Sequence, residues 1–154
     1  MIVNCGSQDG YGFEREAFGI ASPDVDERLR SERVRSFTEA IQKVMRCQHF
    51  LDWNPRKPKT PLIQSLFRRV AHGLRDHRDL RFYISVGTWL DPMGVDCFFE
   101  HQDRVVTIDL TVRPFKHDLR ADFLLSRLDF VLDCHYQLAD RMAKKLSRRQ
   151  KLVA

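Results

Sequence analysis

The chain has 154 residues, of which 43% are hydrophobic and 31% are charged. This balance is typical of one globular domain with a heavily charged surface, and it excludes the low hydrophobicity of a disordered chain. The net charge of +5 and the isoelectric point near 9.2 favour a nucleic-acid partner, with an acidic protein as the alternative. No apolar run approaches the roughly 20 residues of a membrane span, and the N-terminus lacks a secretory signal. We therefore expect a cytoplasmic protein without membrane contact.

The four cysteines and six histidines do not follow the spacing of a zinc site. Cys47 and Cys134 fall at or beside apolar helical positions, and Cys97 falls in a strand-like run. Cysteines of this kind are typical of small buried side chains in a reducing compartment. We expect no zinc and no disulfide framework.

Residues 1–21 are rich in glycine and polar groups, and we interpret them as an irregular arm that precedes a single α/β domain over 22–154. Ser22 can cap a helix that has a proline at its first position, so we expect a helix from there to about Leu51. The positions that keep its helical period are Val34, Phe37, Ile41, Val44, Met45 and Gln48.

A proline-rich loop follows, and Thr60 is then placed to cap a second helix with Pro61 at its first position. The stripe of that helix consists of Leu62, Leu66, Val70 and Leu74. A last helix begins near Leu128 and ends in a basic stretch. Its periodic positions are Val131, Leu132, His135, Leu138, Met142 and Leu146.

Between the helices, residues 81–89, 95–101 and 104–112 are rich in aromatic and β-branched side chains and predict three strands. Residues 121–126 are either a fourth short strand or the beginning of the last helix. The expected fold class is α/β. It has a small mixed or antiparallel sheet of three to four strands, flanked by two N-terminal helices and one C-terminal helix.

The second and third predicted strands carry two acids, Asp96 and Asp109. A two-residue loop at 102–103 places these acids opposite each other on one face, whereas a shift by one residue would set Asp96 opposite the apolar Ile108. Two facing carboxylates repel each other unless a cation lies between them, and Mg²⁺ is the natural choice because it prefers oxygen ligands. The alternative is that both acids are solvated or pair with nearby arginines, Arg104 or Arg113.

The two acids resemble the motif of the restriction-endonuclease-like superfamily, the PD-(D/E)XK nucleases. That family has an aspartate at the start of one strand and a second acid on the next strand, two residues before a lysine. The resemblance covers roughly 84–125 and implies that Asp96, Asp109 and the backbone carbonyl of Leu110 bind Mg²⁺. Thr111 stands where the family has its lysine, which orients and activates the attacking water. The resemblance leaves Lys116, or else Arg113 in the same loop, to take over that role.

The family often carries a further acid on its first helix, and the candidate here is Glu39, for which solvent exposure is the alternative. Glu100 shares a face with Asp96 but lies near the hairpin tip, so we interpret it as a surface acid. Cations in the proline-rich loop, after the third strand and in the last helix are candidates for contacting nucleic acid, although a solvated surface explains them equally well. They are Arg56, Lys57, Lys59, Arg113, Lys144, Lys145, Arg148 and Arg149.

Three hypotheses follow from the sequence. In the first, the protein is a metal-dependent nuclease-like domain that acts on nucleic-acid phosphodiesters, with catalytic Asp96, Asp109 and Lys116. In the second, it is a catalytically inactive domain of the same fold that binds nucleic acid or a protein partner. In the third, it is an adaptor whose basic surface meets an acidic protein.

Overall fold

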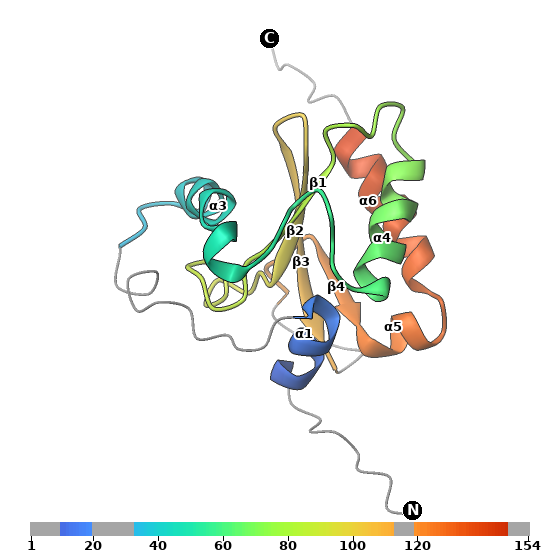
Figure 1. Ribbon diagram of the computed structural model, residues 1–154, viewed down its shortest axis with the longest axis horizontal. Helices are drawn as coiled ribbons and strands as arrows, with labels where there is room; N and C mark the ends of the chain where they lie inside the picture. Colours follow the sequence, from blue (N-terminus) through green and yellow to red (C-terminus); the bar gives the residue numbers. More distant parts are fainter. Residues whose placement is uncertain (1–9, 20–32, 113–118, 148–154) are drawn as a thin grey trace, which may run out of the picture.

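The computed structural model describes residues 10–19, 33–112 and 119–147 and has the expected α/β architecture (Figure 1). A four-stranded mixed sheet is preceded and followed by helices along the chain. In the part of the chain that the structure describes, no helix is long and apolar enough to cross a membrane. The elements are α1 (Gly10–Phe18), α3 (Phe37–Arg46), the 3-10 helix η1 (Gln48–Leu51), α4 (Pro61–His72), β1 (Arg81–Ile84), β2 (Cys97–His101), β3 (Arg104–Thr111), β4 (Phe123–Ser126), α5 (Arg127–Val131) and α6 (His135–Ser147).

The strands lie in the order β1-β2-β3-β4, with antiparallel pairing up to β3 and parallel pairing between β3 and β4. His101 pairs with Arg104, which confirms the predicted two-residue hairpin loop. The two loop residues, Gln102 and Asp103, have φ angles of 49° and 65°, as the tight turns that match strand twist require. β1 is shorter than predicted and ends at Ile84, because the chain then turns through Gly87 with a φ of 73°.

Helix α4 confirms the prediction made from its cap, since Thr60 Oγ1 accepts a hydrogen bond from the Ile63 N–H at 3.3 Å. Helix α3 begins later than predicted. Residues 33–36 are not helical, and Ser36 caps the helix by accepting from the Glu39 N–H at 3.1 Å. The predicted start at Ser22 lies outside the described residues.

The prediction of an irregular N-terminal arm is wrong for residues 10–18, which form helix α1. Phe13, Ala17 and Phe18 are each at most 2% exposed and belong to the main core. A helix of nine residues is marginal in isolation, so its stability comes from this packing and not from local propensity. Because the segment is rich in glycine and polar residues, its short apolar stripe is difficult to recognise in the sequence. The remainder of the predicted arm lies outside the described residues.

The last predicted helix is interrupted. β4 is a strand, a capping box between Ser126 and Asp129 then begins α5, and Asp133 breaks the helix with a φ of 55°. As a result, the predicted buried positions Val131 and Leu132 are 70% and 61% exposed. Two cysteines, at positions 47 and 97, are buried as expected, whereas the cysteine at 134 is exposed because it lies in this interruption.

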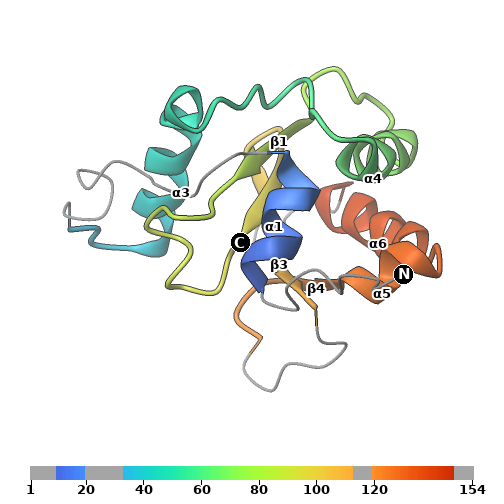
Figure 2. The same ribbon diagram turned by 60° about the horizontal axis from the view of Figure 1, so that its bottom comes forward.

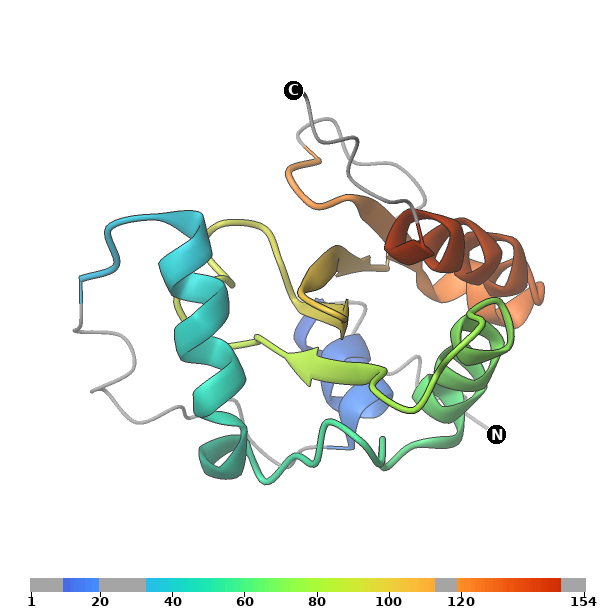
Figure 3. The ribbon, with the colours of Figure 1, turned by 90° about the horizontal axis from the view of Figure 1, so that it is seen from above.

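The sheet separates two apolar clusters (Figure 3). Side chains of one face, such as Phe82 and Phe99, pack with α1, α4 and α6 in the main core. Side chains of the other face, such as Tyr83 and Phe98, pack with α3 and with the turn before β2. Alternate residues of one strand thus enter different clusters, as the two-residue period of a strand requires. Figure 2 shows α1 in front of the sheet beside β3, where it contacts that strand.

Candidate functional site

The two predicted acids meet at the end of the sheet where β2 begins and β3 ends. Both Asp96 and Asp109 are 4% exposed, and their carboxyl groups hydrogen-bond to each other. The regular pairing of β2 with β3 ends at Cys97 opposite Ile108. Beyond it, the Asp96 N–H donates to the Ile108 carbonyl at 2.9 Å. The strands are therefore out of the simple register at Asp96, and the side chains still come together.

Asp96 is also bound by the backbone of the facing strand. The N–H of Leu110 donates to Asp96 Oδ2 at 2.8 Å, and the same carboxyl group hydrogen-bonds with Asp109. A buried side chain held by two such contacts has little rotational freedom. The fold thus sets the position of this acid before any ligand binds.

The surroundings of Asp96 disfavour its charged form. Burial, the charge of Glu14, the hydrogen bond with Asp109 and the charge of Asp109 raise its pKa to about 9, although the Leu110 N–H opposes the rise. A hydrogen bond between two carboxyl groups needs one proton between them, and Asp96 holds that proton at neutral pH. An acid with so strongly shifted a pKa is characteristic of functional sites, although structural networks produce such shifts too.

Glu14 is the member of this cluster that the sequence prediction missed. It lies on α1, is half-buried, and its charge contributes to the raised pKa of Asp96. Glu39, the candidate suggested by the resemblance, contacts residues close to it in the sequence. It accepts a hydrogen bond from the Arg35 N–H at 2.9 Å and forms an ion pair with Lys43 at 3.8 Å. Glu14 and not Glu39 lies near the two acids because α1, the helix that the sequence did not predict, packs beside β3.

The interpretation of Glu100 as a surface acid is wrong. It is 7% exposed, because β2 is a central strand, and it forms an ion pair with Arg81 at 3.7 Å across β1 and β2. Arg104, one of the arginines considered as a partner for the two acids, instead donates from its guanidinium to the Leu146 carbonyl at 2.6 Å. The other, Arg113, lies outside the described residues.

Cys97, the residue after Asp96, remains a thiol. Its pKa is raised well above the ordinary value, chiefly by complete burial and further by the charges of Asp96, Asp109 and Glu14. A thiol of this kind is a poor nucleophile and a poor metal ligand, because both roles need the thiolate. The chemistry of the cluster is therefore that of its carboxyl oxygens.

These oxygens fit a hard divalent cation that uses one or two carboxylates and keeps several waters, as Mg²⁺ does. In the described part of the chain, no group of three or more histidine, cysteine or acidic side chains is arranged to hold a metal ion. The donor set is then the Asp96–Asp109 pair, with Glu14 nearby as a further negative charge. The Leu110 carbonyl as a ligand remains a prediction.

The cations expected to support this site are only partly described. Thr111, at the position of the family's lysine, is half-buried at the end of β3 and pairs with Ser126 of β4. Lys116 lies outside the described residues, as do the predicted nucleic-acid contacts Arg148 and Arg149.

The other predicted nucleic-acid contacts fall in two regions. Arg56 and Lys57 are exposed in the proline-rich loop, where Lys59 pairs with Asp52 at 2.8 Å. That loop runs along β1, since the Phe82 N–H donates to the Pro55 carbonyl. The second region is on α6, where Lys144 is exposed and Lys145 forms an ion pair with Asp122.

Comparison of the chain with models of protein families, with curated proteins and with solved structures finds no match. No family is assigned to the chain on that basis. Its function is therefore inferred from the positions and chemistry of its own residues.

Proposed function

We propose that the protein is a metal-dependent nuclease-like domain that cleaves phosphodiester bonds of nucleic acids, in the manner of the PD-(D/E)XK nucleases that its sequence resembles. The observation that carries the proposal is the buried, hydrogen-bonded pair of Asp96 and Asp109, with Glu14 close enough to raise the pKa of Asp96. Acids buried against one another reduce stability, and such arrangements concentrate at sites where they have a chemical task.

In this proposal Asp96 and Asp109 hold Mg²⁺ through their carboxylate oxygens. Mg²⁺ bound there would supply an activated water and would stabilise the negative charge that develops on the phosphate. Asp96 has to lose its proton to act as a ligand, and the Leu110 N–H favours the charged form by donating to it. Glu14 adds to the negative potential that attracts a cation.

Position 111 limits how the water can be oriented. The threonine there has a hydroxyl group that can donate and accept hydrogen bonds but carries no positive charge. We assign the missing charge to Lys116, which follows five residues later in the sequence. If that assignment fails, the second hypothesis, an inactive domain that binds nucleic acid, takes its place.

The overall charge agrees with a polyanionic substrate. A net charge of +5 raises the local concentration of nucleic acid by long-range attraction. The cluster around Asp96 is acidic and would repel phosphate by itself. A divalent cation at the acids reduces this conflict, because its two positive charges offset the charges of the two carboxylates that bind it.

Cleavage of labelled single-stranded and double-stranded DNA and RNA in Mg²⁺ or Mn²⁺ tests the proposal. The wild type is compared with Asp109→Asn and with a matched control, Asp140→Asn, which removes an exposed acid that pairs with Arg69 at 2.9 Å. We expect metal-dependent cleavage by the wild type and the control, and loss of at least about a hundredfold in Asp109→Asn. Circular dichroism verifies that all three proteins are folded.

Equal cleavage by Asp109→Asn and the wild type would overturn the proposal. A folded wild type that cuts none of the four substrates would overturn it as well. Retained nucleic-acid binding in that case would favour the inactive domain, with Thr111 marking the loss of catalysis.

A further inference from the structure

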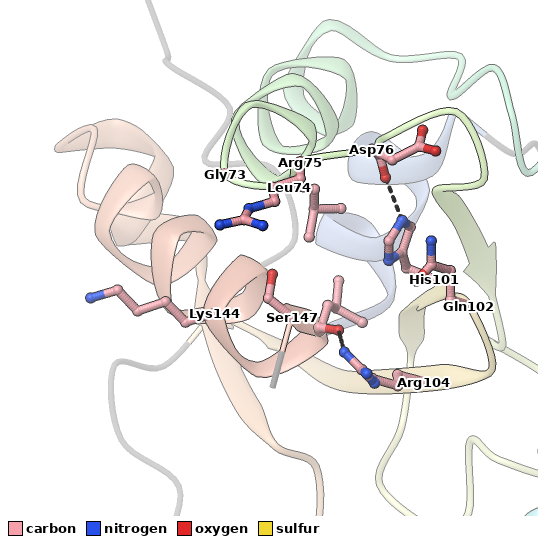
Figure 4. Close-up of a pocket in the computed structure, with 10 residues that line it drawn as sticks. Gly73, Leu74, Arg75, Asp76, His101, Gln102, Arg104, Lys144 and Ser147 are labelled. Atoms are coloured by element: carbon pink, nitrogen blue, oxygen red, sulfur yellow. Dashed lines mark hydrogen bonds between the residues drawn. The ribbon is translucent and has the colours of Figure 1, made fainter. Parts of the chain in front are cut away.

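A groove of about 820 Å³ lies at the other end of the β2–β3 hairpin from the acids (Figure 4). The residues after α4, the hairpin tip and the C-terminal turns of α6 line it. Three cations come from these three elements, one from each: Arg75, Arg104 and Lys144. The acid in the lining, Asp76, has its carboxylate paired with Arg78 at 3.0 Å. The groove is therefore cationic.

A buried histidine in the wall of the groove has an unsatisfied atom. His101 is 5% exposed, and its Nε2 lies 2.5 Å from the Asp76 carbonyl. A carbonyl can only accept, so Nε2 carries a hydrogen and donates it. Nδ1 of the same ring is buried without a hydrogen-bond partner, and an unpaired buried polar atom is costly. The Nε2 contact anchors the hairpin tip to the residues after α4 and so fixes one wall of the groove.

Arg104 is held in place at the same wall. Its guanidinium donates to the carbonyl of Leu146, in the last turn of α6, at 2.6 Å, and a guanidinium has further N–H groups in a fixed plane. Because this contact already fixes the side chain, less conformational entropy is lost when the remaining groups bind a phosphate oxygen. Figure 4 shows Arg75 and Lys144 on the α4 and α6 sides of the groove.

We infer that this groove binds the phosphate backbone of a nucleic acid through Arg75, Arg104 and Lys144. An extended polyanion fits better than a single phosphate, because the cations come from three separate elements. The basic sequence also continues directly after α6 with Arg148 and Arg149. The inference does not rest on the proposed cleavage, since binding here requires neither the acids nor a metal.

The test is binding of a fluorescently labelled oligonucleotide, single-stranded and duplex, measured by anisotropy in EDTA over a series of salt concentrations. The test variant is Arg75→Gln with Lys144→Gln, both exposed. The matched control is Arg35→Gln with Arg46→Gln, which removes the same charge from two exposed positions, one just before α3 and one at its last residue. Helix α3 lies on the other side of the sheet (Figure 3).

We expect the test variant to bind roughly tenfold more weakly and the control to change much less. The dependence of log affinity on log salt should also flatten by about 1.8 for duplex DNA, because each lost phosphate contact reduces the slope by about 0.9.

Three results would overturn the inference. The first is no binding by the wild type, and the second is an equal loss of affinity in the test and control variants. The third is that polyglutamate of equal charge competes as well as unlabelled oligonucleotide, which would indicate an acidic protein as the occupant. Because EDTA removes metal, a failure here is separate from a failure of the proposed cleavage.

Discussion

The carboxyl groups of Asp96 and Asp109 share a hydrogen bond in a buried position where the regular pairing of β2 with β3 ends. Because one of the two must hold a proton at neutral pH, the pair links the stability of the fold to pH and to any cation that replaces the proton. The consequences can be measured separately.

Asp96→Asn should stabilise the protein at neutral and alkaline pH. The pKa of Asp96 rises from 3.8 to about 9 on folding, so the folded state binds the proton more tightly. The stability that this proton provides is complete below about pH 4 and is lost as the pH rises toward 9. Asparagine can make the same hydrogen bonds as the protonated acid at every pH. Urea denaturation at pH 8 without metal should show a gain of about 1–3 kcal/mol.

That gain should shrink toward zero as the pH falls to about 4. A difference between variant and wild type that is constant from pH 4 to 8 would contradict the assignment of the proton to Asp96. Reversible unfolding at each pH is the necessary control.

Asp122→Asn should have the opposite effect. Burial disfavours the charge of this acid, but hydrogen bonds from Lys145 and Thr107 outweigh it and lower the pKa of Asp122. The substitution removes the charge that Lys145 pairs with while leaving the backbone of β3 in place. Because solvent screens this partly exposed ion pair, a loss of about 0.5–1 kcal/mol is expected by urea denaturation at pH 7. No loss would show that this ion pair contributes nothing to stability.

Phe18→Ala should destabilise the fold strongly, because α1 is part of the core. Phe18 is fully buried and packs against Trp53 and Phe82, so its truncation leaves a cavity that costs about 3–5 kcal/mol. Phe50, which is 64% exposed, provides the matched control Phe50→Ala. Thermal unfolding of both variants measures the difference. Similar melting temperatures would indicate that α1 is a detachable arm.

Mn²⁺ should bind more tightly at pH 8 than at pH 6, since the ion has to displace the proton of Asp96 below its pKa of about 9. Calorimetric titrations in two buffers of different ionisation enthalpy should show about one proton released per ion at pH 7. Asp109→Asn should lose the binding. Asp140→Asn should retain it, and equal affinities at both pH values would contradict the proton displacement.

The register of the hairpin could be predicted from the sequence because an acidic side chain on the apolar face of a buried strand costs free energy. Val106, Ile108 and Leu110 form one apolar face, which favoured the register that keeps Asp96 away from Ile108, and the structure confirms the two-residue loop. Thr60 and Pro61 predicted the start of α4 because both act locally. The departure from register at Asp96 was not predictable, since it depends on contacts between strands.

Contacts that depend on tertiary packing were missed for the same reason. Over 13–18, the part of helix α1 whose burial the structure describes, the apolar stripe consists of Phe13, Ala17 and Phe18. This period was too short to recognise, and Glu14 was overlooked with it. The groove at the hairpin tip was also missed, because Arg75, Arg104 and Lys144 lie far apart in the sequence. The exposure of Val131 depends on a single left-handed residue, Asp133.

The rate of oligonucleotide cleavage under single-turnover conditions, at subsaturating Mn²⁺ between pH 6 and 9, tests most directly whether the two acids act as a metal-dependent pair. The account predicts that the wild-type rate rises with pH as Asp96 loses its proton to the metal, and that Asp109→Asn is inactive throughout. Asp140→Asn should follow the wild type. A folded wild type that is inactive at every pH, or an Asp109→Asn protein that cleaves at the wild-type rate, would contradict it.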